Sequence, residues 1–254
     1  MQLPSVSKSK RHPFYITSCP YDPYVSVHIR LIGDFTRALG DAVGVSPHKP
    51  DEGPDLIDNY EAALQNGQQM PVLRIDGPYG NLADVVYKND IAVLVGCGIG
   101  LAPWVSILKN IWHLRHAPKL PDRLRHVELM WICRDTRALE WFRSLISTLE
   151  SGINELTPSL RIHIYVAQKM DVDATANILL NSIGSEVDSI TGLMSKTNFG
   201  RPNFTKLFTS IGHGILDGAY PNGPKAGMRT TVGVYLGGPS GVGKYKVHSL
   251  HTQR

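Results

Sequence analysis

The chain has 254 residues, of which 42% are hydrophobic and 19% are charged; these proportions exclude a disordered or fibrous protein and allow one large domain or two small ones. A net charge of +4 from dispersed lysines and arginines suits small anionic ligands better than nucleic acid. Three widely spaced cysteines fit a reducing compartment and predict neither disulfides nor a metal site, and no apolar stretch is long enough to predict a membrane span.

Residues 1–88 predict a β-rich domain. Residues 24–31 alternate apolar and polar side chains, as a half-buried strand does, and residues 71–75 predict a second short strand. One helix is expected near residues 35–43. We therefore expect antiparallel β-structure with a single helix in this part of the chain.

Residues 89–254 predict an α/β domain. A buried apolar strand at 91–95 runs into a glycine loop, and residues 104–114 follow with the apolar spacing of one helical face. The pattern continues with strands at 127–133, 161–166 and 232–236 and a helix at 138–149, whereas 192–201 shows no clear pattern and 218–227 predicts a loop. This alternation predicts a parallel sheet with helices on both faces.

The glycine loop is Gly96-Cys97-Gly98-Ile99-Gly100, placed between a strand and a helix. Backbone N–H groups at a helix N-terminus bind anionic oxygen, and glycine lets a diphosphate approach the backbone closely. The spacing is GxGxG, which differs from the GxGxxG of ordinary dinucleotide domains. The loop predicts a diphosphate site, and a tight turn without a ligand is the alternative.

A second glycine motif, Gly238-Pro-Ser-Gly-Val-Gly243-Lys244, fits part of a P-loop and favours a phosphotransferase. Tyr245 stands where a Ser or Thr would bind Mg²⁺. Only ten residues follow Lys244, too few for the helix and the Walker-B acid that a P-loop domain requires. The P-loop is therefore the weaker interpretation.

Several polar residues suggest ligand contacts. The stretch His12-Pro-Phe-Tyr-Ile-Thr-Ser18, with Arg30 on the next strand, has the ring and guanidinium chemistry that binds a flavin and a diphosphate, although a barrel core explains it as well. Arg134 and Asp135 end a buried strand, where Arg134 would select NADPH through its 2′-phosphate or simply be solvated. His113 and His116 have metal-ligand spacing, but without a third ligand we expect them to be solvated.

Taken together, these segments resemble the cytosolic dehydrogenase region of the NADPH oxidase family, within the ferric reductase and ferredoxin reductase superfamily. The matching stretches occur in family order over most of the chain: residues 12–18, 28–36, 76–80, 96–104, 133–136 with 140–142, 191–193 and 200–204. The resemblance implies a ferredoxin-reductase-like fold, with a partial flavin-binding β-barrel in residues 1–88 and an NADPH-binding domain in residues 89–254. It also implies that the chain is a piece or truncated product of an oxidase.

The resemblance assigns cofactor roles by position. The implied FAD-binding residues are His12, Pro13, Phe14, Thr17, Ser18, His28, Ile29, Arg30 and Thr36, with Tyr15 where Thr is common in the family. The implied NADPH-binding residues are Gly96, Gly98, Gly100, Pro103, Arg134, Arg201, Gly238 and Pro239. No metal-binding residue is implied, and haem is expected only in a membrane part absent from this chain.

Two departures concern catalysis. Ala102 stands where the family has Thr, and Gly237 stands where the family has a cysteine expected to position the nicotinamide, so no residue is assigned as catalytic. We expect hydride transfer from NADPH to FAD as the dehydrogenase part of a superoxide-generating oxidase at the cytosolic face of a membrane, with a haem-bearing transmembrane domain and cytosolic activator subunits as partners. A catalytically silent NADPH-binding module is the alternative.

Overall fold

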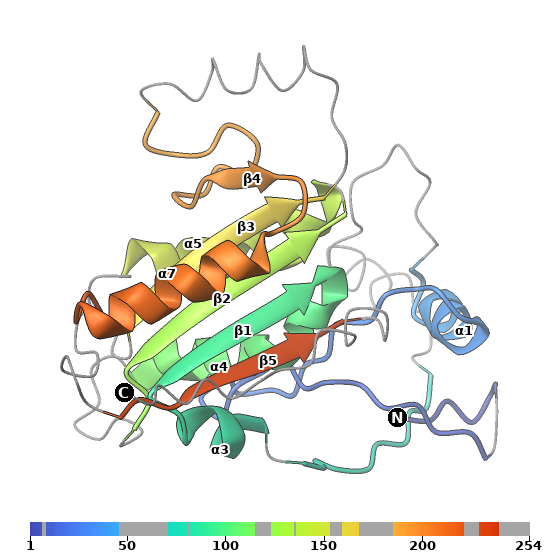
Figure 1. Cartoon of the computed structure of the whole chain (residues 1–254). Helices are drawn as coiled ribbons and strands as arrows, with labels where there is room; N and C mark the ends of the chain where they lie inside the picture. The colour runs from blue at the N-terminus through green and yellow to red at the C-terminus, as the bar shows by residue number, and fades with distance from the viewer. Residues whose placement is uncertain are drawn as a thin grey trace.

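A computed structural model of the chain describes residues 1–6, 9–45, 71–80, 82–114, 123–134, 136–152, 159–167, 185–220 and 229–238. Its centre is a five-stranded sheet in the order β4-β3-β2-β1-β5, in which every neighbouring pair is parallel (Figure 1). The strands are β1 (Ile91–Cys97), β2 (His126–Cys133), β3 (Ser159–Val166), β4 (Thr197–Phe199) and β5 (Val232–Gly237). The parallel sheet confirms the predicted α/β class.

Helices cover both faces of this sheet. One face packs against α3 (Leu82–Tyr87), α4 (Ala102–Leu114) and α5 (Arg143–Ser151), and the other face packs against α7 (Phe204–Leu216). In β1, Ala92 and Leu94 face the first group, whereas Ile91, Val93 and Val95 face α7. A strand buried on both sides needs an unbroken apolar run, which is why residues 91–95 contain no polar side chain.

Two short 3-10 helices connect strands to helices at the carboxyl edge of the sheet. The first, η1 (Gly98–Leu101), joins β1 to α4, and the second, η2 (Arg137–Phe142), precedes α5. The single helix predicted for residues 138–149 is therefore divided: its first part is η2 and only its second part is α-helical. Periodicity alone does not distinguish these two helix types over a few residues.

The N-terminal segment forms a separate small core. Leu3, Phe35 and Leu39 are its buried members, and helix α1 (Asp34–Ala42) contributes two of them, which confirms the helix predicted near residues 35–43. The strands expected at 24–31 and 71–75 occur among the described residues only as single antiparallel bridges, Ile16 with Val27 and Gln2 with Arg74. The antiparallel direction agrees with the prediction, but the described pairing is too short to form regular strands.

Three elements were not predicted from the sequence. The three-residue strand β4 is too short for an alternation pattern, and α3 has only six residues. Helix α7 is longer, but Gly212 and Gly214 lower its intrinsic helix propensity. It begins at Asn203, whose side chain accepts a hydrogen bond from the Lys206 N–H, and it is stabilised by the apolar contacts of Ile211 and Ile215 with the sheet. No described helix combines the length and apolarity that spanning a bilayer requires.

Candidate cofactor site at the carboxyl edge of the sheet

The order of the strands determines where a ligand fits. From β1 the chain proceeds outward through β2, β3 and β4, and then returns to place β5 on the opposite side of β1. The direction of winding therefore changes between β1 and β5, and open α/β sheets bind ligands outside the carboxyl ends of the strands at such a point. The glycine loop follows β1 at this position, and Gly238 follows β5.

The three glycines of the loop have different physical roles. A Cβ on Gly96 would lie 2.7 Å from Leu101 Cα, and a Cβ on Gly100 would collide with the Gly237 carbonyl oxygen. These two glycines let the strand end and the loop pack closely against η1 and β5. Gly98 differs, because its φ is +55° and a Cβ there would meet no described atom within 4 Å. Gly98 is therefore the point of the loop where a diphosphate has room to approach the backbone.

Two tryptophans hold the loop in place. Trp104 donates its indole N–H to the Val95 carbonyl at 3.0 Å, and Trp131 donates to the Gly98 carbonyl at 3.3 Å. Both side chains are buried, at 3% and 0% exposure. The two indole groups therefore hold the end of β1 and the glycine loop from the protein interior.

The end of β5 lies directly against this loop. Gly238 has a φ of +154°, and a Cβ on it would lie 2.9 Å from Cys97 Cβ. A Cβ on Gly237, where the family resemblance implies a cysteine, would collide with the Gly100 carbonyl oxygen. Burial raises the pKa of the half-buried Cys97 thiol, so it is protonated at neutral pH.

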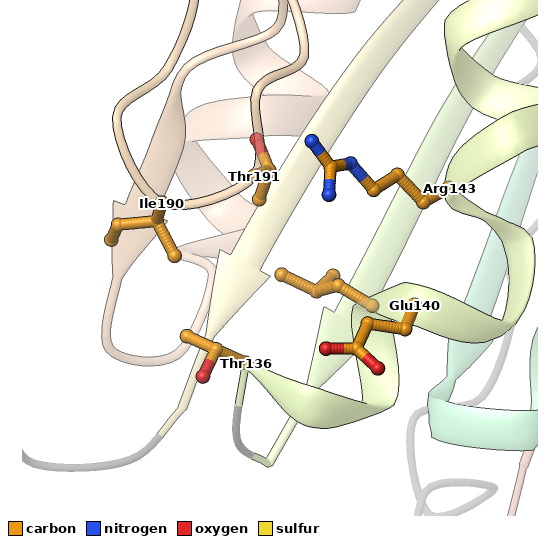
Figure 2. Close-up of a pocket in the computed structure, with 6 residues that line it drawn as sticks. Thr136, Glu140, Arg143, Ile190 and Thr191 are labelled. Atoms are coloured by element: carbon orange, nitrogen blue, oxygen red, sulfur yellow. The ribbon is translucent and has the colours of Figure 1, made fainter. Parts of the chain in front are cut away.

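A small pocket lies further along the same edge, beyond the ends of β2 and β3 (Figure 2). Its volume is about 130 Å³, and Arg143 extends into it from α5 toward Thr191. The lining residues are Thr136, Leu139, Glu140, Arg143, Ile190 and Thr191. The role of Arg143 was not predicted from the sequence, although Glu140 and Thr191 lie in stretches that carried the family resemblance.

The two arginines predicted to bind the adenosine phosphate are both exposed at this edge. Arg134 follows β2, and Arg201 follows β4, which lies two strands away in the sheet. Neither guanidinium pairs with a carboxylate among the described residues, so both are available to an anion. Pro103 instead is buried in the first turn of α4, where proline suits the backbone. Asp135, Pro239, Lys244, Tyr245 and His116 lie outside the described residues.

The predicted flavin-binding residues near Thr17 form a connected polar group. Thr17 is fully buried, and its hydroxyl is 2.9 Å from Ser26 Oγ and 2.8 Å from His28 Nδ1. Ser18 Oγ accepts the Ser26 N–H at 3.0 Å. Burial, followed by the charge of Lys109, lowers the pKa of His28, which therefore presents a neutral ring. The Thr17 hydroxyl thus positions His28, and the Ser18 hydroxyl holds the Ser26 backbone; both residues are buried.

The other predicted flavin-binding residues surround α1. The His12 ring stacks on Phe35 with centroids 4.0 Å apart, and Phe14 and Ile29 pack against the N-terminal core. The Thr36 hydroxyl accepts the backbone N–H groups of Ile32 and Gly33, so its observed contact is a helix cap. Pro13 and Arg30 are exposed.

Contacts with α4 fix this segment to the nucleotide domain. Ser106 donates its hydroxyl hydrogen to the Ser18 carbonyl at 2.7 Å, and Lys109 forms an ion pair with Asp22 at 2.8 Å. His28 packs against Phe142 of η2 with ring centroids 4.8 Å apart. In Figure 1, α1 lies on the side to which the arrowheads of β1 and β5 point. The N-terminal segment is therefore anchored to the helix that the glycine loop begins.

Replacing Thr17 with valine tests this polar group. Thr17→Val keeps the side-chain shape but leaves Ser26 and His28 without a buried partner, so we expect the free energy of unfolding to fall by about 1–2 kcal/mol. Urea denaturation measures this loss. Thr148→Val, at an exposed position on α5, is the matched control and should stay within about 0.5 kcal/mol. Equal effects of the two substitutions would show that the Thr17 hydroxyl is not structural.

Comparison with known protein families agrees with this geometry. Residues 89–247 match the ferric reductase NAD-binding domain, and residues 1–83 match a FAD-binding domain. A parallel sheet with a glycine loop at its switch point, joined to a flavin domain, defines a flavin- and nicotinamide-dependent oxidoreductase. The chain belongs to the family of the ferric reductase NAD-binding domain. Its cofactors are FAD and a nicotinamide dinucleotide.

The similar curated proteins are NADPH oxidases. The chain is 37% identical to human NADPH oxidase 3 over 91% of this chain and 39% of that protein. It is 34% identical to mouse NADPH oxidase 1 over 96% of this chain and 36% of that protein. A superoxide-generating NADPH oxidase heavy chain of Dictyostelium discoideum is 31% identical over 96% of this chain and 32% of that protein. The chain thus spans 32–39% of the length of these relatives.

The family match also decides between the two glycine motifs. The matched residues 89–247 include the P-loop-like stretch 238–244, which is therefore part of the NAD-binding domain. The phosphotransferase alternative is not supported. The predicted ferredoxin-reductase-like fold is confirmed by the FAD-binding and NAD-binding matches together with the parallel sheet.

Proposed function

We propose that this chain is the dehydrogenase part of a superoxide-generating NADPH oxidase. The observation that supports the proposal most directly is the open space at Gly98, at the switch point of a sheet whose next helix also anchors the flavin-side segment. When bound, the nicotinamide supplies a hydride and FAD accepts it. The protein contributes orientation, because α4 connects the two binding regions through Ser106 and Lys109.

The proposed NADPH position follows the carboxyl edge of the sheet. In this proposal Gly96, Gly98 and Gly100 hold the diphosphate, Gly238 lies beside the nicotinamide, and Arg134 and Arg201 bind the adenosine phosphate. The family resemblance assigns Pro239 to the nicotinamide as well. FAD is held by residues from His12 to Thr36, with the domain boundary at residues 88–89. The exposed guanidinium of Arg30 supplies a positive charge for the flavin diphosphate.

Flavin reduction is the direct test of this function. FAD is added to the purified chain, unbound flavin is removed, and NADPH is added without oxygen. We expect retained flavin to lose its visible absorbance at a rate that rises with NADPH concentration until the site is saturated. Absence of flavin retention, or retained flavin that NADPH does not bleach, would contradict the proposal.

A silent NADPH-binding module is a second candidate, favoured by one observation. Gly237 carries no thiol, and its backbone lies so close to Gly100 that no side chain fits there in this arrangement. Such a module binds NADPH with the affinity of a working site but leaves added FAD oxidised. Measuring NADPH binding by its fluorescence in the same samples distinguishes the two functions.

The whole oxidase provides the context of this reaction. We propose that the chain acts at the cytosolic face of a membrane and passes electrons to a haem-bearing transmembrane domain, and that cytosolic subunits activate the complex. The support is the similarity to proteins named as superoxide-generating NADPH oxidases, of which this chain spans about a third.

The preference for NADPH provides a residue-level prediction. A charge-assisted hydrogen bond from Arg134 to the 2′-phosphate contributes about 1.5–3 kcal/mol. Arg134→Ala should therefore raise the Kd for NADPH about 10-fold to 100-fold and leave the Kd for NADH nearly unchanged. Fluorescence titration with both nucleotides measures this. Arg123→Ala, next to the opposite edge of the sheet, is the control, and equal weakening of NADH and NADPH binding by Arg134→Ala would contradict the assignment.

A further inference from the structure

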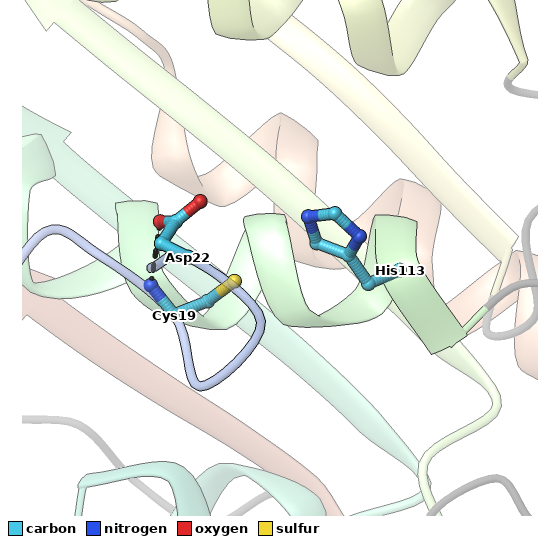
Figure 3. A group of neighbouring side chains, drawn as sticks. All are labelled: Cys19, Asp22 and His113. Atoms are coloured by element: carbon cyan, nitrogen blue, oxygen red, sulfur yellow. Dashed lines mark hydrogen bonds between the residues drawn. The ribbon is translucent and has the colours of Figure 1, made fainter. Parts of the chain in front are cut away.

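Three side chains with metal-binding atoms meet where the flavin-side segment touches α4. Cys19 and Asp22 lie on the loop after the predicted flavin-binding stretch, and His113 lies in the last turn of α4 (Figure 3). Their ligand atoms all lie within 4.8 Å of one another, and the Cys19 sulfur points toward the His113 ring. The sequence did not predict this group, because His113 lies about 90 residues after Cys19 and Asp22 in the chain.

The three donors match the chemistry of one metal ion. Thiolate sulfur, imidazole nitrogen and carboxylate oxygen are the three ligand types of protein-bound Zn²⁺. With Zn–S near 2.3 Å and Zn–N near 2.0 Å, tetrahedral ligand atoms lie about 3.5 Å apart. The group therefore needs to contract by about 1 Å, which a small rotation of the exposed His113 side chain along the Tyr21 ring provides.

Local contacts already hold the ligands in place. Asp22 Oδ2 accepts the Cys19 backbone N–H at 2.9 Å, and the Asp22 N–H donates to the Cys19 carbonyl at 3.0 Å, so the two residues form a closed turn. The Tyr21 ring stacks on His113 with centroids 5.1 Å apart. Cys19 is only 5% exposed. Two ligands are thus fixed on one turn, and the third is oriented by an aromatic ring.

Lys109 is the competitor for this site. Its ammonium group donates to Asp22 Oδ2 at 2.8 Å, which lowers the pKa of Asp22. Among the described residues, no hydrogen bond reaches the other carboxylate oxygen, Oδ1, which therefore remains open to a cation. Lys109 also places a positive charge close to the incoming ion, so it weakens metal binding without blocking it.

We propose that Cys19, Asp22 and His113 bind a Zn²⁺ ion, with water as the fourth ligand. On binding, the Cys19 thiol loses its proton to solvent and the sulfur bonds to the metal. Because Cys19 and Asp22 belong to the flavin-side segment and His113 to the nucleotide domain, the ion connects the two parts of the chain. Zinc then stabilises the arrangement that Lys109 and Ser106 already support.

Cobalt provides the direct test, because Co²⁺ occupies zinc sites and a thiolate ligand gives it a charge-transfer band in the near ultraviolet. CoCl₂ is titrated into the full chain after removal of metals with a chelator. We expect the band to saturate at one equivalent and to disappear when ZnCl₂ is added. His113→Ala should weaken cobalt binding at least tenfold, Cys19→Ser should remove the band, and Lys109→Met should tighten binding about tenfold.

The controls keep the proposal falsifiable. His213→Ala, at an exposed histidine on α7, should bind cobalt as the unmodified chain does. Cys19 is buried, so its replacement also affects packing. The decisive comparison is therefore between His113→Ala and the unmodified chain, with circular dichroism confirming that the variant is folded. A band that does not saturate, that persists in Cys19→Ser, or that is unaffected by His113→Ala would overturn the assignment.

Discussion

Gly100→Ala is expected to remove most NADPH-dependent flavin reduction. The new methyl group would collide with the Gly237 carbonyl oxygen, and Gly238 Cα would lie 2.6 Å away. All of these obstacles are backbone atoms, so β5 and the glycine loop must separate. Such overpacking costs about 1–3 kcal/mol in a folded core, and the same shift displaces the proposed diphosphate site. We expect the Kd for NADPH to rise by about 100-fold.

A glycine outside the site provides the control for this prediction, and Gly98 provides a comparison within the site. Gly212→Ala in α7 meets no described atom within 4 Å and should stabilise the helix by up to about 1 kcal/mol without affecting NADPH affinity. Gly98→Ala also has space, but its positive φ makes alanine strained by about 1 kcal/mol. Fluorescence titration and urea denaturation measure both effects. Gly100→Ala with unchanged NADPH affinity would show that the contact between Gly100 and Gly237 does not shape the site.

These glycines also show which features of the site can be predicted from the sequence. The strand, the glycine loop and the helix were all predictable, because a buried apolar run followed by glycines and a helical periodicity has few other solutions. The sequence did not predict which of these glycines are required for packing and which leaves room for a ligand. Gly96 and Gly100 are required by contacts with Leu101 and Gly237, and Gly237 lies 137 residues after Gly100 in the sequence. Only the packing of β5 beside β1 reveals that the loop and the end of β5 depend on each other.

The flavin-side residues show a different limit of prediction from the sequence. The resemblance selected Thr17, Ser18 and Thr36 as cofactor contacts, and the structure gives each hydroxyl a partner within the protein. Their hydrogen bonds support the positions of His28, Ser26 and α1. A motif identifies which residues a site requires, but it does not separate those that touch the ligand from those that hold the site together. For these three residues, direct contact with FAD stays a prediction.

Among the charged residues that the structure describes, we expect replacement of Glu128 to lower the free energy of unfolding the most. It lies on β2 with its side chain 1% exposed, and His163 Nε2 and Arg161 Nη1 approach its oxygens at 2.7 and 3.2 Å. His126 Nε2 is 3.1 Å away, at ion-pair distance but without the alignment of a hydrogen bond. Tyr220 packs against His126, and burial together with the nearby carboxylate raises the pKa of Tyr220 to about 12. The carboxylate thus has three basic side chains within 3.2 Å of its oxygens.

Glu128→Gln keeps the side-chain shape and removes the charge. Breaking a buried ion pair from one side costs about 3–5 kcal/mol, because the partners remain buried without compensation. We expect the free energy of unfolding to fall by an amount near the lower end of this range, because Arg161 is half exposed and partly solvated. Urea denaturation at neutral pH measures it, with the exposed Glu186→Gln as a control expected to stay within about 0.5 kcal/mol. NADPH affinity should not change, because Glu128 lies in the half of β2 far from the glycine loop.

The pH dependence of stability tests the same group independently. Burial alone would raise the pKa of Glu128, but the neighbouring imidazoles of His126 and His163 outweigh it and lower the pKa to about 2 from an ordinary value of 4.5. A carboxyl with a lowered pKa stabilises the folded state fully above its unfolded pKa, and this contribution is lost as the pH falls from about 4.5 toward 2. The expected contribution is roughly 3 kcal/mol. Glu128→Gln should flatten the acid limb of the stability curve by this amount, and an unchanged acid limb would show that Glu128 is not ionised in the folded protein.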